Sequence, residues 1–181
     1  MDITEMTPCQ LISNLIRILD KSGAQTMLDK QFLQHAITLA ADNVAAGGRP
    51  FGAVVVKNEQ IIATGVNQML ERHDPTAHAE LLALRQAGEV LNSVRLDDCT
   101  VYASGQPCPM CLAAIRMSGI KRVVYAYSNQ DAEPFGLSTE AIAEALRVSP
   151  DQQSGLQFIQ LKPKDETQSM LYQTWWQQHH A

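Results

Sequence analysis

Residues 100–127 read TVYASGQPCPMCLAAIRMSGIKRVVYAY, and this stretch decides the fold class. Its two ends, Thr100–Ala103 and Arg122–Tyr127, are short runs rich in β-branched and aromatic residues, as is typical of strands. Between them, Pro109–Met117 predicts a helix that Ser118-Gly119 ends. Two strands joined through a helix lie parallel in one sheet, and the helix covers a face of that sheet. The stretch therefore predicts an α/β protein.

The N-terminal part of the chain predicts two helices. Leu11–Leu19 places apolar residues on one helical face, and Ser22-Gly23 should end this helix. A second helix should begin near Asp29 and end at Gly47-Gly48-Arg49-Pro50. Because 181 residues suit about one domain, we expect an N-terminal extension with a helix over residues 1–28 and a single domain over residues 29–181.

The other elements alternate between strand and helix. In chain order they are a hairpin of Phe51–Val56 and Ile61–Gly65, a helix over His78–Gly88, a helix over Thr139–Leu146, a strand over Leu156–Leu161 and a last helix over about Asp165–Trp176. The hairpin is antiparallel, whereas strands separated by helices are parallel, so the sheet should be mixed. We expect a three-layer α/β/α sandwich.

The composition is that of a globular protein with a hydrophobic core, since 45% of the residues are hydrophobic and 18% are charged. The net charge of −5 is opposite in sign to that of most proteins that bind a phosphate backbone. No apolar run approaches the roughly 18 residues of a membrane span, and the first five residues are acidic where a secretory signal is basic. Four cysteines are too few for a disulfide scaffold. We expect a cytoplasmic protein whose partner is neither a membrane nor a nucleic acid.

Two short motifs carry chemistry. His78-Ala79-Glu80 lies near a helix start, and Pro107-Cys108-Pro109-Met110-Cys111 lies at another. At helical spacing the two sulfurs share one face, and Pro109 suits the first helical position. The positive end of the helix dipole favours the thiolate form, which is the form that binds metal. Two sulfurs and one imidazole indicate zinc.

The number of ligands separates a catalytic site from a structural one. A structural zinc needs four protein ligands, but the other cysteines, Cys9 and Cys99, lie far from the motifs in the sequence. His78, Cys108 and Cys111 make three ligands, which leaves the fourth position open to water. We therefore expect one catalytic Zn²⁺ per subunit.

Glu80 follows the proposed histidine ligand by two residues and is predicted to move protons. Two thiolates neutralise the charge of Zn²⁺, so the metal should acidify its water less than a site of neutral histidines would. A nearby general base is then needed, and we expect the Glu80 carboxylate to carry the proton to the departing amine without binding the metal.

The pattern H-x-E…P-C-x-x-C is the signature of zinc-dependent deaminases, and the chain resembles the cytidine deaminase-like superfamily. Within it, residues 74–80 (DPTAHAE), 107–112 (PCPMCL), 47–53 (GGRPFGA) and 95–99 (RLDDC) look like those of bacterial guanine deaminases. The resemblance runs from about Phe32 to Phe135. It implies a hydrolytic deaminase, a five-stranded mixed sheet and a homodimer.

The resemblance also implies substrate-binding residues. Asn67 matches an asparagine that holds the substrate, Phe51 matches an aromatic residue that stacks on the base, and the backbone N–H of Ala79 is placed to hold an exocyclic oxygen or a ring nitrogen. Guanine deaminases carry an aspartate that reads the purine in the loop before the next helix. This chain has none at that place, so Asp131 or Glu133 is left as a possible substitute.

The function expected is deamination of a free nucleobase or a related aminated heterocycle, with conversion of guanine to xanthine and ammonia as the first choice. Cytosine deamination and deamination of adenosine in tRNA are the alternatives among enzymes. The alternative outside enzymes is an inactive zinc-binding module, against which the presence of Glu80 argues.

Overall fold

The computed structural model describes residues 8–162 and 170–180, and among these the side chains from residue 23 onward. Its helices and strands, in chain order, are α1 (Pro8–Ala45), β1 (Gly52–Lys57), β2 (Gln60–Val66), α2 (Met69–Arg72), α3 (Ala79–Leu91), β3 (Cys99–Gly105), α4 (Pro109–Met117), β4 (Arg122–Tyr127), α5 (Asn129–Ala132), the 3-10 turn η2 (Glu133–Phe135), α6 (Glu140–Ala145), the 3-10 turn η3 (Pro150–Gln152) and α7 (Leu171–His179). None of the helices in these residues is long and apolar enough to cross a membrane.

The sheet has the order β2-β1-β3-β4. β1 is antiparallel to β2 and to β3, whereas β3 and β4 are parallel and are joined through α4. The predicted hairpin, the strand–helix–strand unit and the mixed sheet are therefore confirmed.

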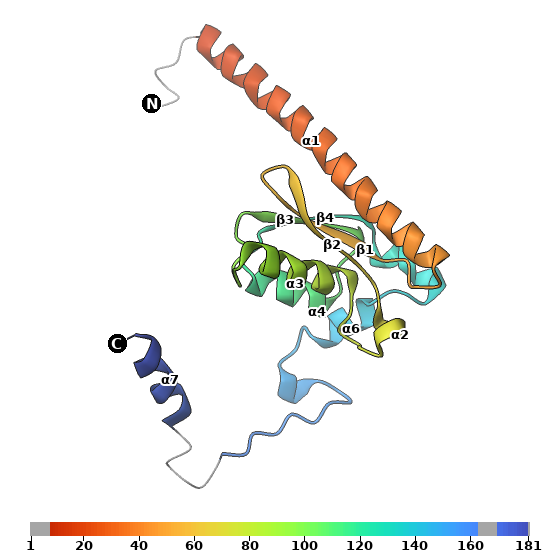
Figure 1. Ribbon diagram of the computed structural model, residues 1–181, viewed down its shortest axis with the longest axis vertical. Coiled ribbons are helices and arrows are strands. Elements are labelled where there is room, and N and C mark those ends of the chain that lie inside the picture. The colour runs from red at the N-terminus through yellow and green to blue at the C-terminus, as the bar shows by residue number, and fades with distance from the viewer. Residues whose placement is uncertain (1–7, 163–169, 181) are drawn as a thin grey trace. The chain divides into compact units, whose positions relative to one another are not determined.

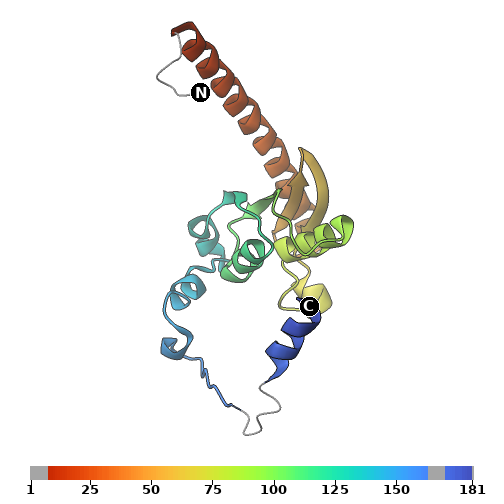
Figure 2. The same ribbon diagram turned by 90° about the vertical axis from the view of Figure 1, so that its left-hand side faces the viewer.

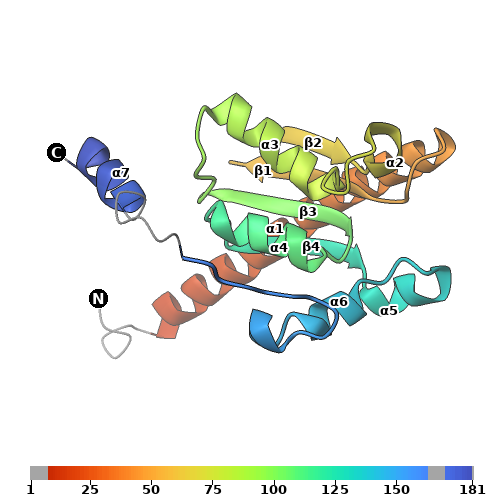
Figure 3. The same cartoon turned by 90° about the horizontal axis from the view of Figure 1, so that it is seen from below.

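Helices cover both faces of the sheet (Figures 1 and 3). The alternating side chains of β1 separate the two layers of the core, because neighbouring residues of a strand point to opposite faces. Val54 and Val56 pack with Phe32 and Leu33 of α1. Val55 instead belongs to a larger cluster formed with α3 and α4, whose members include Ala79, Ala83, Leu84 and Ile115. The predicted α/β/α layering is thus present.

Two glycines let the helices approach the strands closely. A Cβ atom on Gly52 of β1 would overlap the carbonyl oxygen of Ala36 in α1, and one on Gly65 of β2 would overlap the carbonyl oxygen of Ala79 in α3. Only glycine, which has no Cβ atom, allows this approach. The first turn of α3 is thereby held against the sheet.

The sheet of the described residues has four strands, so the expectation of five was wrong. Leu156–Leu161 alternates as predicted but forms neither strand nor helix, and Phe158 and Leu161 are exposed. An alternating pattern shows which side chains share a face, but it does not supply the neighbouring strand with which the backbone must pair.

The predicted helix end at Ser22-Gly23 was also wrong, because α1 is one uninterrupted helix (Figures 1 and 2). A glycine inside a helix costs about 1 kcal/mol relative to alanine and a serine costs less, which the rest of a long helix can offset. α1 runs through the boundary expected at residues 28 and 29, and the division into extension and domain stays a prediction. By compactness the chain divides near Ala143, with a second unit from Glu144 onward. The last helix is α7, and the start predicted at Asp165 lies outside the described residues.

Asp29 of α1 is hydrogen-bonded to one residue of β3 and one residue of the edge strand β4. Its carboxylate accepts hydrogen bonds from the Tyr102 hydroxyl at 2.7 Å and from the Arg122 guanidinium at 2.9 Å, and Arg122 also donates to the Tyr102 oxygen at 3.1 Å. The hydrogen bond from Arg122, followed by those from Tyr102 and Gln25, lowers the pKa of Asp29 to about 2. Burial and the Asp29 carboxylate raise the pKa of Tyr102 to about 12.

We expect Asp29→Asn to lower the free energy of unfolding by about 1 kcal/mol, because it removes the charge from the hydrogen bonds with Tyr102 and Arg122. The effect is no larger because solvent partly screens the charge of Arg122. Since the folded pKa of Asp29 is lowered, its contribution is present above pH about 4 and is lost as the pH falls toward about 2. Denaturant unfolding at several pH values measures both effects. Glu144→Gln, which removes an exposed ion pair with Arg147, should leave stability nearly unchanged, and an equal loss in both variants would contradict the assignment.

Candidate active site

The first turns of α3 and α4 meet beneath the sheet. His78 is the extended residue that precedes α3, and Cys108 is the extended residue that precedes α4, where Pro109 occupies the first turn. Cys111 lies one turn further along α4 and is fully buried. The two sequence motifs are therefore brought together as predicted.

The spacing of the three candidate ligands fits zinc. His78 Nδ1 lies 3.5 Å from Cys108 Sγ and 3.5 Å from Cys111 Sγ, and the three atoms all lie within 4.8 Å of one another. Bond lengths of about 2.3 Å for Zn–S and about 2.0 Å for Zn–N, at a tetrahedral angle, place sulfur and nitrogen about 3.5 Å apart. Both nitrogen–sulfur distances thus match those of a tetrahedral zinc site.

The environment of the cysteine pair favours a thiolate. The hydrogen bond from the Cys111 thiol, followed by the neighbouring His78, lowers the pKa of Cys108 to about 4. The same hydrogen bond and burial raise the pKa of Cys111 in the metal-free chain. Deprotonated sulfur is the metal-binding form, so Cys108 is prepared to bind a metal ion.

Glu80 lies beside the cysteine pair but outside the group of three ligands. It is in the first turn of α3, its side chain is 7% exposed, and its Oε2 accepts a hydrogen bond from Cys111 Sγ at 3.6 Å. Burial raises the pKa of Glu80. A buried carboxyl group with a raised pKa holds a proton more readily than an exposed one, which suits a group that takes up and releases a proton.

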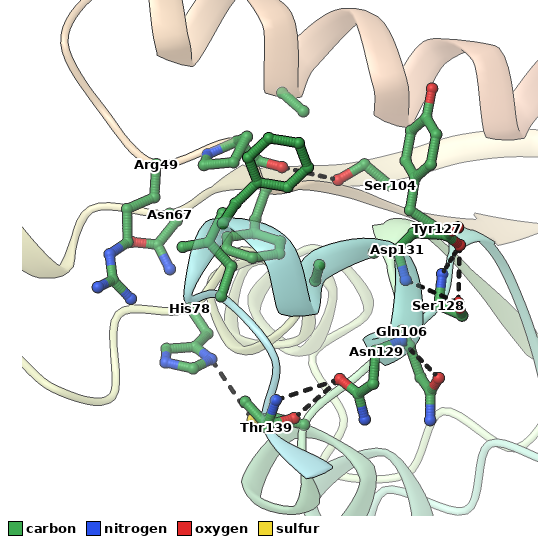
Figure 4. Close-up of a pocket in the computed structure, with 18 of the residues that line it drawn as sticks. Arg49, Asn67, His78, Ser104, Gln106, Tyr127, Ser128, Asn129, Asp131 and Thr139 are labelled. Atoms are coloured by element: carbon green, nitrogen blue, oxygen red, sulfur yellow. Dashed lines mark hydrogen bonds between the residues drawn. The ribbon is translucent and has the colours of Figure 1, made fainter.

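A cavity of about 360 Å³ opens onto this centre (Figure 4). Residues from both faces of the sheet and from the segment after β4 line it: Ile37, Ala40, Ala41, Val44, Arg49, Pro50, Phe51, Asn67, His78, Glu80, Ser104, Gly105, Gln106, Cys108, Tyr127, Ser128, Asn129, Asp131, Ala132, Phe135, Leu137 and Thr139. Two of the three expected substrate-binding residues, Asn67 and Phe51, are among them. The cavity is mainly apolar with a few polar groups, as ligand pockets are.

Asn67 is held in a defined orientation. Its side chain is buried, at 4% exposure, and its Oδ1 accepts a hydrogen bond from the backbone N–H of Met69 at 3.2 Å. Because Oδ1 is used in this way, the Nδ2 group is the part of the amide that can donate to a ligand. From α1, Asn43 Nδ2 donates to the backbone carbonyls of Asn67 at 3.0 Å and Arg49 at 2.7 Å, which fixes this wall of the cavity.

Phe51 lies between α1 and β1 with its ring over Gly105. A Cβ atom on Gly105 would lie 3.0 Å from the Phe51 ring, so the absence of a side chain there makes room for the aromatic ring. Ser104, which is buried, accepts a hydrogen bond from the Gly52 N–H at 3.0 Å and donates one to the Pro50 carbonyl at 3.4 Å. These bonds fix the backbone on both sides of Phe51.

The remaining expected residues fall in different places. Ala79 is the first residue of α3, so the helix does not use its N–H group. The carboxylate of Asp131 lies at the cavity but accepts hydrogen bonds from the Ser128 N–H at 2.8 Å and the Ser128 hydroxyl at 2.7 Å. Glu133 is exposed and is not among the residues that line the cavity. Neither carboxylate is free inside the cavity to read a base.

Sequence reasoning singled out Asp131 and Glu133 in the segment that follows β4, but it missed Asn129 and Thr139. Asn129 and Thr139 line the cavity and are hydrogen-bonded to each other (Figure 4). The one available signal was Ser128 followed three residues later by Asp131, since an acidic residue three positions after a serine can cap a helix start. The two residues form such a capping box at the start of α5.

The comparisons with known proteins agree with this geometry. The family model for the cytidine and deoxycytidylate deaminase zinc-binding region matches residues 26–127, more than half of the chain. The chain belongs to this deaminase family. It is a zinc-dependent hydrolytic deaminase, as the sequence predicted.

Three known proteins illustrate the range of the family. The guanine deaminase of Bacillus subtilis is 44% identical over 136 residues, which cover 75% of this chain and 86% of that protein. Its crystal structure matches with a TM-score of 0.75 over 84% of this chain and 96% of the other. A tRNA-specific adenosine deaminase of Buchnera aphidicola is 42% identical over 57% of this chain and 68% of its own length. A solved chain in complex with 2,6-diaminopurine is 31% identical, with a TM-score of 0.59 over 61% of this chain and 62% of that one.

We expect Cys108→Ala to lower the zinc content of the purified protein from about one atom per chain to near zero, because two protein ligands hold zinc poorly. Elemental analysis measures this. Cys99→Ala is the matched control, since Cys99 is also a buried free cysteine but lies outside the group of three. Full zinc content in Cys108→Ala would contradict the ligand assignment.

Proposed function

We propose that this deaminase converts guanine and water to xanthine and ammonia. The observation that carries the proposal is one cavity that joins the candidate zinc ligands His78 and Cys108 to Glu80, Asn67 and Phe51. The similarity to the guanine deaminase of Bacillus subtilis, over 86% of that protein, supports a purine base as the substrate.

The residues around the cavity have distinct parts in this reaction. Zinc held by His78, Cys108 and Cys111 would supply a Lewis acid that activates water for attack. Glu80 accepts a proton from that water as the new C–O bond forms at the ring carbon that carries the amine. The electron pair of the ring C=N bond moves to the ring nitrogen during this attack. Glu80 then gives its proton to the amine nitrogen as the ring C=N bond re-forms and the C–N bond to the amine breaks, so that ammonia leaves. The remaining hydroxyl proton shifts to the ring nitrogen, which gives the carbonyl group of xanthine. The carboxyl group ends in its starting state.

The other groups bind and orient the base. Asn67 donates through Nδ2 to an acceptor atom on the edge of the ring, an orientation that its bond to Met69 supports. Phe51 stacks on the flat face of the base. The N–H group of Ala79, at the positive end of α3, holds a ring nitrogen or an exocyclic oxygen of the substrate.

Deamination of adenosine in tRNA is the second candidate, and the 42% identity with the Buchnera enzyme favours it. The net charge of −5 argues against it, because binding to a phosphate backbone relies on clustered cations. Arg49 is the one Lys or Arg side chain among the described residues that line the cavity. Binding of a free base needs no such cluster.

We further propose that the enzyme is a cytoplasmic homodimer. The resemblance to guanine deaminases supports the dimer. Cys99, which lies outside the group of ligands, is a free cysteine, and this supports a reducing compartment. Sedimentation of the zinc-loaded protein distinguishes a dimer from a monomer.

Ammonia release from a panel of guanine, adenine, cytosine, their nucleosides and a tRNA anticodon stem-loop tests the substrate. We expect the zinc-loaded enzyme to act on guanine with the highest kcat/KM of the panel. A higher value for adenosine in a tRNA anticodon stem-loop would favour the second candidate instead. No ammonia from any member of the panel would overturn the proposed function.

We expect Glu80→Gln and Glu80→Ala to lower kcat for guanine at least a hundredfold, since general acid–base catalysis contributes about 10²–10⁴. Both variants should keep their zinc, because Glu80 is not one of the three ligands. Steady-state kinetics and elemental analysis on the same samples check the two statements. Turnover at the wild-type rate in either variant would refute the assignment of Glu80.

A further inference from the structure

The segment from Ser128 to Glu140 is a built part of the cavity wall. At its start, Ser128 caps α5, and the Ala132 N–H donates to the Ser128 carbonyl at 3.1 Å. At its turn, the Leu137 N–H donates back to the Ala132 carbonyl at 3.2 Å. These internal hydrogen bonds give the segment a defined shape.

Asn129 joins the two ends of the segment. It is buried, at 8% exposure, and its Oδ1 accepts hydrogen bonds from the Thr139 N–H at 3.2 Å and hydroxyl at 3.3 Å. Its Nδ2 donates to Glu140 at 2.9 Å. Its backbone N–H donates to Gln106 Oε1 at 3.1 Å, two residues before the ligand Cys108 (Figure 4). The segment is thus attached directly to the loop that carries the metal ligand.

Phe135 lies in this segment and is an unusual side chain for its position. It lines the cavity with His78 and Glu80, yet it is 76% exposed. Gly136 follows it in the left-handed conformation, with φ +66°, and its N–H donates to the Glu133 carbonyl at 3.0 Å. The backbone therefore presents a large apolar ring at the mouth of the cavity, where nothing in the described residues covers it.

Phe51 and Phe135 lie at different depths of the same cavity. The Phe51 ring is half-buried against Gly105, three residues before Cys108, whereas the Phe135 ring is mostly exposed. A planar molecule that reaches both rings must extend from the metal centre to the mouth. A base of two fused rings has more length to do so than a base of one ring.

We propose that Phe135 determines specificity by contacting the outer ring of a bound bicyclic amine, while Phe51 contacts the ring that reacts. The inference rests on the proposed function and adds a preference for fused two-ring substrates over pyrimidines. Contact with a flat base removes the exposed Phe135 surface from water and adds stacking.

The test compares Phe135→Ala and Phe135→Tyr with the wild type, all loaded with zinc, using guanine as the two-ring base and cytosine as the one-ring base. Ile142→Ala is the matched control, because Ile142 is an exposed apolar residue of α6 outside the cavity lining. KM and kcat are measured for guanine, and the inhibition constant of cytosine is measured in competition with it. Zinc content and the unfolding midpoint are recorded for each variant.

We expect Phe135→Ala to raise KM for guanine roughly tenfold, as loss of one base–aromatic contact does, with kcat within about twofold of the wild type. Phe135→Tyr should restore KM, and the inhibition constant of cytosine should not change. Zinc content and stability should stay at wild-type values because the ring is largely exposed.

An unchanged KM for guanine in Phe135→Ala, an equal rise in Ile142→Ala, or a proportional weakening of cytosine would overturn the inference. If the wild type releases no ammonia from guanine, the proposed function fails separately. The comparison is then made on the binding of 2,6-diaminopurine and cytosine by calorimetry, where only a selective loss of the two-ring ligand in Phe135→Ala supports the role of Phe135.

Discussion

The close approach of α3 to β2 is the constraint on which the site depends. Gly65 of β2 faces Ala79 and Ala83 of α3, and no residue with a Cβ atom fits in its place. The approach holds the start of α3 under the sheet, where β3 ends and α4 begins. His78 and Cys108, each the residue before a helix, then come within 3.5 Å of each other. The geometry of a metal centre is set here by backbone packing.

The ligand side and the substrate side of the site are built differently. The ligands lie at the starts of two helices, whereas Asn67 and Phe51 lie in loops beside the strand ends. The loops are held by single polar side chains from other elements, namely Asn43 from α1 and Ser104 from β3. Both arrangements end at one cavity, so an error in either would separate the base from the groups that act on it.

The sequence predicted the features that depend on local spacing. His78 and Glu80 are two residues apart, and Cys108 and Cys111 are three apart, so a helix that starts at each motif brings the two residues of each pair close together. The strand–helix–strand unit over residues 100–127 was predictable for the same reason.

Features that depend on a distant partner were not predictable. Leu156–Leu161 has the pattern of a strand, but no pattern contains the neighbour with which it would pair. Ser22-Gly23 has the composition of a helix end. The small free-energy cost of these two residues in a helix is offset by the rest of the long helix α1. Asn129 and Thr139, which form part of the cavity wall, are ten residues apart and are joined by hydrogen bonds across an irregular segment. Such a segment has no periodic pattern from which these bonds could be predicted.

The hydrogen bonds of Asn129 to Thr139 and Glu140 close residues 129–140 into a loop. The start of this loop is hydrogen-bonded to Gln106, and several of the residues that follow line the cavity. Insertions or substitutions within this loop would change the shape of the cavity that a substrate meets. The three metal ligands and Glu80, which lie outside the loop, would stay in place. Changes in a few residues of this loop would therefore suffice to alter which amine is the substrate. No evolutionary intermediate would need to lose its zinc.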